Sequence, residues 1–139
     1  MDLTGKAVLV TGASRGIGEA AARAFAAAGA KVALTARSED RIAAIAGEIG
    51  EGAVAIPCAV ARYWEVDAAV EAAVAAFGRL DVVVNNAGAI EPIAHMHRAD
   101  PESWGRIVDI NLKGAHHGVR AAQPHKLTAD GRPLVAVAS

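Results

Sequence analysis

Cysteine is nearly absent from this chain. Cys58 is the only one in 139 residues, so no disulfide can form within the chain and zinc sites built from four thiolates are excluded. This use of cysteine fits a reducing compartment, and we expect a cytoplasmic protein. The histidines suggest no metal site either. His95 and His97 lie in a loop, His116 and His117 are adjacent, and no carboxylate completes a ligand pattern.

Long apolar runs and an excess of one charge are also missing. No apolar stretch approaches the ~20 residues that a membrane span requires, and the first residues lack the basic and apolar regions of a secretory signal. Fourteen basic residues stand against 15 acidic ones, which leaves no electrostatic footprint for nucleic acid. We therefore expect neither a membrane nor a nucleic-acid partner.

Two periodicities alternate along the chain. Short apolar runs, typical of buried strands, occur at residues 7–10, 32–36, 53–56, 81–84 and 134–138. Apolar residues at helical spacing lie between them, for example Ile42, Ile45 and Ile49. This order predicts an α/β fold of the doubly wound Rossmann type, with five parallel strands ordered 3-2-1-4-5 and right-handed crossovers. Residues 1–139 then form a single domain.

A helix is predicted from Pro101 to about Gln123. Asp100 is a good N-cap and Pro101 a favourable first residue. Trp104 lies on the apolar stripe of this helix, and so does Asn111. A buried amide is unfavourable without partners, so Asn111 is a candidate functional residue; the alternative is a core asparagine that the local backbone satisfies.

The segment "VTGASRGIG" joins the first strand to the first helix. Its glycines, Gly12, Gly16 and Gly18, have the spacing G-x-x-x-G-x-G. Glycine permits a tight turn, and the N–H groups that open a helix attract a pyrophosphate. A glycine-rich turn without a ligand is the alternative, but the position directly after a strand favours a dinucleotide site.

These residues resemble the cofactor loop of the short-chain dehydrogenases/reductases, and "NNAG" after the fourth strand resembles the second signature of that family. The resemblance covers the whole chain. It implies cofactor-binding roles for Gly12, Ser14, Arg15, Gly16, Ile17, Gly18, Asn86, Ala87 and Gly88.

The end of the second strand favours NADP over NAD. An NAD site usually has an acid there, but this sequence has Ala36 followed by Arg37. Arginine is a planar, multi-donor cation suited to a 2′-phosphate, and Arg15 offers a second one. The alternative is that Arg37 is simply solvated.

The stretch after the third strand departs from the family pattern. The family commonly has an aspartate near the adenine, where this chain has Ala59. The backbone of Val60 still implies an adenine contact. Cys58 is interpreted as a small buried residue and not a nucleophile.

The resemblance implies a catalytic asparagine, a serine and a Tyr-x-x-x-Lys pair. Asn111 matches the asparagine, and Ser139 matches the serine that ends the fifth strand. The pair does not occur, because the only tyrosine, Tyr63, is followed four residues later by Asp67.

We therefore expect five of seven strands, with the domain truncated after the fifth and the 139-residue chain inactive alone. The complete protein is expected to be an NADP-dependent oxidoreductase that interconverts a ketone and a secondary alcohol. We also expect a homodimer or homotetramer, formed through the helix that begins at Pro101. The alternative function is a non-catalytic dinucleotide-binding fragment or pseudoenzyme.

Overall fold

The computed structural model describes residues 1–129 and contains one parallel sheet. Its strands are β1 (Ala7–Thr11), β2 (Lys31–Ala36), β3 (Ala53–Pro57) and β4 (Val82–Val84), in the order β3-β2-β1-β4. All neighbouring strands run parallel. The predicted fold class and the order of the first four strands are confirmed. The strand predicted at residues 134–138 and Ser139 lie outside the described residues.

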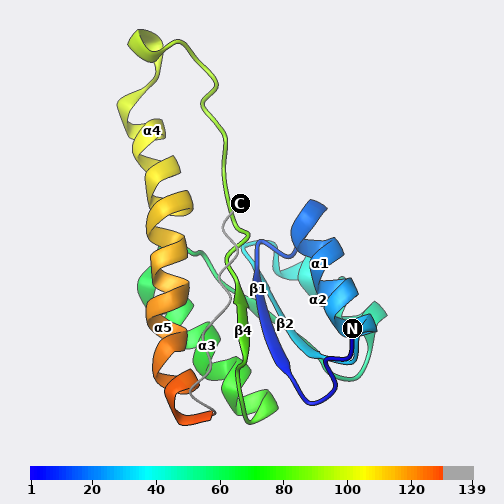
Figure 1. Cartoon of the computed structure of the whole chain (residues 1–139). Helices are drawn as coiled ribbons and strands as arrows, with labels where there is room; N and C mark the ends of the chain where they lie inside the picture. Colours follow the sequence, from blue (N-terminus) through cyan, green and yellow to red (C-terminus); the bar gives the residue numbers. More distant parts are fainter. Residues whose placement is uncertain (130–139) are drawn as a thin grey trace.

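Helices cover both faces of the sheet (Figure 1). On one face lie α1 (Gly16–Ala27) and α2 (Glu39–Ile49), and on the other lie α3 (Tyr63–Phe77) and α5 (Gly114–Ala129). Two apolar clusters fill the layers. The first contains Val8 and Leu34 with Ile42 of α2, and the second contains Leu9 and Val83 with Val70 of α3. Successive strand residues thus alternate between two cores, which is why the strands are apolar throughout.

Local signals set the ends of several elements. Gly78 ends α3 with a left-handed φ of 76°, a conformation that favours glycine. The Asp100 carboxylate accepts the backbone N–H of Ser103 and caps α4 (Pro101–Val108) as predicted, with Pro101 in its first turn. Gly78 thus ends α3 shortly before β4, and the Asp100 cap begins α4 after the loop that follows β4.

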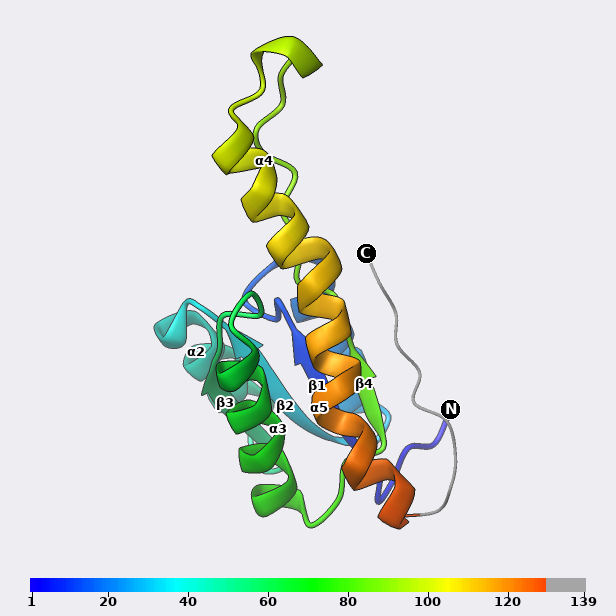
Figure 2. The same cartoon turned by 90° about the vertical axis from the view of Figure 1, so that its left-hand side faces the viewer.

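The helix predicted from Pro101 is interrupted. A π-helical turn, η2 (Asp109–Lys113), separates α4 from α5, and the three segments form one long rod. The loop after β4 and α4 stand out beyond the sheet (Figure 2), with the 3₁₀ turn η1 (Met96–Arg98) near the tip. Trp104, placed on the apolar stripe by the periodicity, is 54% exposed. None of the four strands described in residues 1–129 lies beneath this part of the helix to bury it.

The amino edge of the sheet carries an ionic clamp. The Asp81 carboxylate accepts the Ala7 N–H at 2.9 Å and pairs with Arg79. Burial raises the pKa of Asp81, but the hydrogen bonds from Arg79 and Ala7 outweigh it and leave the pKa below its ordinary value. The clamp ties β1 to β4 at the edge opposite the glycine loop.

Candidate functional site

The glycine loop needs glycine because other backbone approaches it closely. Gly12 has a φ of +64°, and a Cβ there would lie 2.8 Å from the Cα of Ala87. A Cβ on Gly18 would overlap the carbonyl of Gly12 and the side-chain amide of Asn86. Real Cβ contacts are not this short, so α1, the loop and the segment after β4 fit together only with glycine at both positions.

Asn86 and Thr11 bind the two strand ends to each other. Nδ2 of Asn86 donates to the carbonyls of Thr11 at 3.1 Å and Gly12 at 3.2 Å. In return, the Thr11 hydroxyl oxygen accepts the N–H groups of Asn86 and Ala87, both at 3.0 Å. The same hydroxyl donates to the carbonyl of Val84 at 3.3 Å. The glycine loop and the NNAG segment are therefore joined by direct hydrogen bonds.

The N-terminus of α1 is open. Arg15 is its N-cap residue but makes no side-chain cap hydrogen bond. Arg15, Gly16 and Ile17 are all exposed, Ile17 by 76%. Arg41 of α2 stabilises the glycine loop, because its Nε donates to the Ser14 carbonyl at 3.1 Å. The first N–H groups of α1 thus face a surface where an anion can bind.

Asn111 holds the segment after β4 through both ends of its amide. Its Oδ1 accepts the N–H of Ala89 at 2.7 Å, and its Nδ2 donates to the carbonyl of Ala89 at 2.8 Å. The partner lies 22 residues away, so this is a tertiary contact and not local backbone satisfaction. The π-helical turn that contains Asn111 is thereby tied to the sheet edge.

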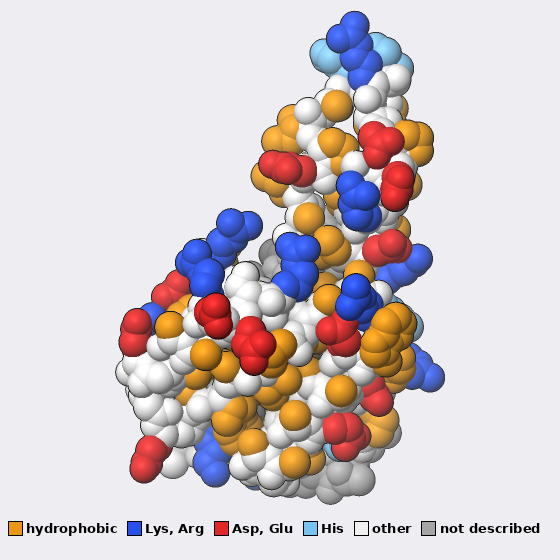
Figure 3. All heavy atoms as spheres, turned by 180° about the vertical axis from the view of Figure 1, so that it is seen from behind, with side chains coloured by type: hydrophobic (Ala, Val, Ile, Leu, Met, Phe, Trp, Pro, Cys, Tyr) orange, Lys and Arg blue, Asp and Glu red, His pale blue; other side chains and the backbone are white. Residues whose placement is uncertain are grey.

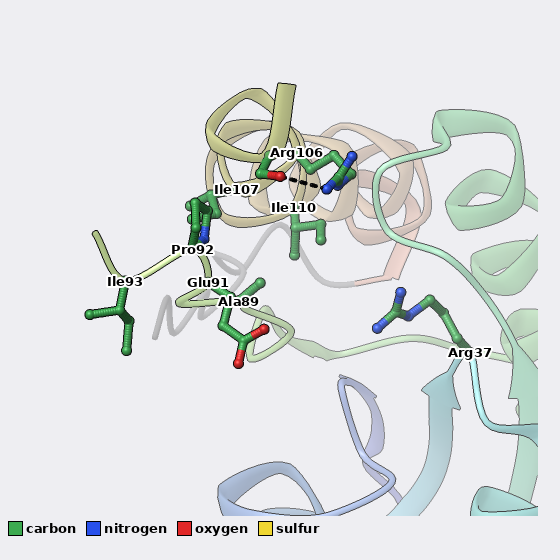
Figure 4. Close-up of a pocket in the computed structure, with 9 residues that line it drawn as sticks. Arg37, Ala89, Glu91, Pro92, Ile93, Arg106, Ile107 and Ile110 are labelled. Carbon is green, nitrogen blue, oxygen red and sulfur yellow. Dashed lines mark hydrogen bonds between the residues drawn. The ribbon is translucent and has the colours of Figure 1, made fainter. Parts of the chain in front are cut away.

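A cavity of about 620 Å³ lies between this segment and the end of β2 (Figure 4). Arg37 directs its guanidinium into the space on one side, and Ile107 and Ile110 close another. The lining residues are Arg37, Ala89, Glu91, Pro92, Ile93, Ser103, Arg106, Ile107 and Ile110. No residue of the glycine loop lines this cavity. Among residues 1–129, neither Arg37 nor Arg15 has an ion-pair partner.

The same edge carries positive charge on its surface. Figure 3 shows Lys and Arg side chains gathered on the top of the body, at the foot of the protruding segment, and His side chains at the tip. The tip residues are His95, His97 and Arg98. Within the described part of the chain, no three His, Cys, Asp or Glu side chains come together as a metal site would require.

The turn after β3 lies at this edge as well. The Cys58 N–H donates to the Ala36 carbonyl at 3.0 Å, which places the turn beside Arg37. Cys58 is buried, which confirms its structural interpretation, and burial together with the Glu65 carboxylate raises the pKa of its thiol to about 11. A thiol with this pKa remains protonated at neutral pH and is a poor nucleophile.

The predicted residues meet at the carboxyl edge, from the glycine loop through Arg37 and Val60 to Asn86–Gly88 and Asn111. Ser139 lies outside the described residues. Sequence reasoning missed Thr11, Arg41 and His117. Thr11 could have been identified from its position, because it directly precedes Gly12 of the glycine loop. The hydrogen bond that His117 makes with Val60 has no local signal, because 57 residues separate the partners.

The model of the short chain dehydrogenase family matches residues 6–139. Two curated relatives are the 3beta-hydroxysteroid dehydrogenase 1 of Eggerthella lenta and the L-fucose dehydrogenase of Oryctolagus cuniculus. The first is 42% identical over 131 residues, which are 91% of this chain and 49% of the relative. The second is 40% identical over 121 residues, which are 87% of this chain and 42% of the relative.

A solved structure has the same fold. It is the 3-ketoacyl-(acyl-carrier-protein) reductase of Brucella melitensis complexed with NADH, with a TM-score of 0.92 and 39% identity. The match covers 99% of this chain and 58% of that one. The chain therefore spans about half of the length of the proteins it matches. No helix among residues 1–129 is both long and apolar enough to cross a membrane.

Proposed function

The chain belongs to the short chain dehydrogenase family, a family of oxidoreductases that use NAD or NADP, and we propose that the whole protein interconverts a ketone and a secondary alcohol with NADP. Two matched proteins carry names that describe such groups, a 3beta-hydroxysteroid dehydrogenase and a 3-ketoacyl reductase. The nicotinamide ring, when bound, gives or takes the hydride.

The close approach of Gly12, Gly18 and Asn86 is the observation that carries this proposal. The N-terminus of α1 next to this packing has no side-chain cap from Arg15 and is exposed at the carboxyl edge of the sheet. A pyrophosphate fits there because free N–H groups and the helix dipole both favour an anion. We assign the pyrophosphate to Ser14, Arg15, Gly16 and Ile17 and the adenine to the backbone of Val60. The rest of the dinucleotide is assigned to Asn86, Ala87 and Gly88.

The choice of NADP depends on arginine. Arg37 points into the cavity at the end of β2 and has no ion-pair partner among the described residues, so it is available for a 2′-phosphate. The position before it holds Ala36, which has no carboxylate to accept a ribose hydroxyl or to repel the phosphate. Arg15 in the glycine loop is proposed as a second cation for the same phosphate.

We propose that Asn111 and Ser139 act at the reacting end. The two bonds to Ala89 fix the plane of the Asn111 amide. One N–H and one lone pair of this amide remain for a water molecule or the substrate. Ser139 would hydrogen-bond the substrate oxygen.

The test is turnover by the whole protein. We expect the protein to oxidise NADPH with at least one member of a panel of steroid ketones, sugars and 3-oxoacyl thioesters. The reaction is monitored as the loss of NADPH absorbance. Binding of NADPH without turnover of any carbonyl or alcohol would favour the non-catalytic alternative. No binding of NADPH or NADH would refute the dinucleotide site itself.

Replacing Arg37 by alanine is expected to weaken NADPH binding about 10- to 100-fold, since one charge-assisted contact contributes roughly 1.5–3 kcal/mol. NADH binding should change less than about threefold, because NADH lacks the 2′-phosphate. Lys31→Ala is the matched control: it removes an exposed charge from the opposite end of the same strand. Titration of both nucleotides into the three proteins measures the difference, and equal losses for the two nucleotides in Arg37→Ala would contradict the assignment.

A further inference from the structure

His117 makes a contact that the proposed chemistry does not use. Its Nδ1 lies 2.7 Å from the carbonyl oxygen of Val60. A carbonyl can only accept, so Nδ1 carries the proton and donates. The adjacent residue, His116, is exposed. Only one of the two neighbouring histidines is therefore directed at the turn after β3.

Neighbouring side chains hold the His117 ring in this orientation. The ring of Tyr63 packs edge-on against it, with centroids 5.5 Å apart. The guanidinium of Arg120 in turn lies over the Tyr63 ring, 4.6 Å from its centroid. The imidazole of α5 is thus partly buried against Tyr63 of α3, and this contact helps to set the direction of its donor.

Gly114, one helical turn before His117, brings α5 against the same turn. A Cβ on Gly114 would lie 2.8 Å from Cγ2 of Val60. Val60 is 8% exposed and belongs to the apolar cluster under α3 and α5. Helix α5 therefore contacts Val60 at two points. Gly114 packs against its side chain, and His117 hydrogen-bonds its carbonyl.

The turn after β3, which contains Val60, lies at the carboxyl edge of the sheet, where the cofactor is proposed to bind. Its first residue, Cys58, is hydrogen-bonded to Ala36, directly before Arg37. Ala87 and Ile110 pack against the apolar cluster that contains Val60. Val60 thus follows the residue bonded next to Arg37 and shares its apolar cluster with Ala87 of the segment after β4. The proposed function places the adenine against this turn.

We propose that His117 is a positioning residue for adenine binding, which holds the Val60 turn at the distance that the adenine requires. The inference rests on the proposed function, because it takes Val60 as an adenine contact. Ala59 has no polar side chain with which to reach the adenine. The position of the backbone at Val60 therefore matters more in this chain than it would beside a carboxylate.

The test compares the two halves of the cofactor in the whole protein. His117→Ala should weaken binding of NADPH and of 2′-phospho-ADP-ribose about 5- to 10-fold, the effect of one lost hydrogen bond in a partly buried site. Binding of reduced nicotinamide mononucleotide should not change. His117→Asn should restore the affinity, because the Asn side-chain nitrogen can take the place of Nδ1. His116→Ala is the control and should bind as wild type does.

Gly114→Ala probes the same contact from the helix side. It should also weaken the adenine half selectively, because its Cβ displaces Val60. The inference is overturned if His117→Ala binds 2′-phospho-ADP-ribose as wild type does, if His117→Asn gives no rescue, or if both halves weaken equally. Failure of wild type to bind either dinucleotide would instead refute the proposed function, and this inference with it.

Discussion

Replacing Gly18 by alanine should weaken dinucleotide binding about 10- to 100-fold. The added Cβ would overlap the Gly12 carbonyl and the Asn86 amide, which are hydrogen-bonded to each other. Neither can yield alone, since Asn86 is also bonded to Thr11. Overpacking of this kind costs roughly 1–3 kcal/mol, and here the displacement falls on the loop proposed for the pyrophosphate. Titration with NADPH and thermal unfolding of the whole protein would measure both effects.

Gly47→Ala provides the matched control. It makes the same chemical change within a helix, but the added Cβ meets nothing within 4 Å apart from the neighbouring backbone of its own helix. We expect unchanged NADPH affinity and a gain in stability of up to ~1 kcal/mol, because alanine is the better helix former. If Gly18→Ala binds and unfolds as Gly47→Ala does, the close packing around Gly18 has no role in cofactor binding.

The second large effect is expected at Asn111. Asn111→Asp keeps the size of the side chain and can still accept the Ala89 N–H, but a carboxylate cannot donate to the Ala89 carbonyl and repels it. The segment after β4 should then shift at the reacting end of the cleft. We expect turnover to fall by about 100-fold or more, within the range of lost proton-transfer groups, while the Kd for NADPH changes less than about fivefold.

Leu112→Ala is the control for this prediction. Leu112 lies in the same π-helical turn but is 68% exposed, so turnover should stay within about twofold of wild type. Steady-state kinetics and NADPH titration of the three proteins separate the two parameters. An Asn111→Asp protein that keeps wild-type turnover, or one that loses cofactor affinity in proportion to its rate, would contradict the placement of Asn111 at the reacting end.

The sheet could be predicted because its signals are local. Strands that face two cores are apolar along their whole length, so runs such as residues 32–36 mark β2 to within one residue. The start of α4 at Asp100 and the end of α3 at Gly78 likewise depend on residues at the helix ends themselves. Both signatures could be assigned to the carboxyl edge because the edge follows from the order of strands and helices.

Contacts between distant segments could not be predicted in the same way. Nothing near Asn111 indicates a π-helical turn, which the structure combines with two bonds to Ala89. The periodicity placed Trp104 on a buried stripe, because spacing along a helix does not reveal where the sheet beneath it ends. His117 was one of a histidine pair without a visible role until α5 was placed against Val60.

The hydroxyl of Thr11 has a consequence for the synthesis of the chain. It bonds to the N–H groups of Asn86 and Ala87, which follow it by 75 and 76 residues. A ribosome that adds about 5–20 residues per second needs roughly 4–15 seconds to make that interval. Once α1 has been made, β1, the glycine loop and α1 lack, for the rest of that interval, the strand that fixes their edge. The glycine loop of the proposed cofactor site therefore belongs to the earliest residues, and its hydrogen bonds are completed only when much later residues have been made.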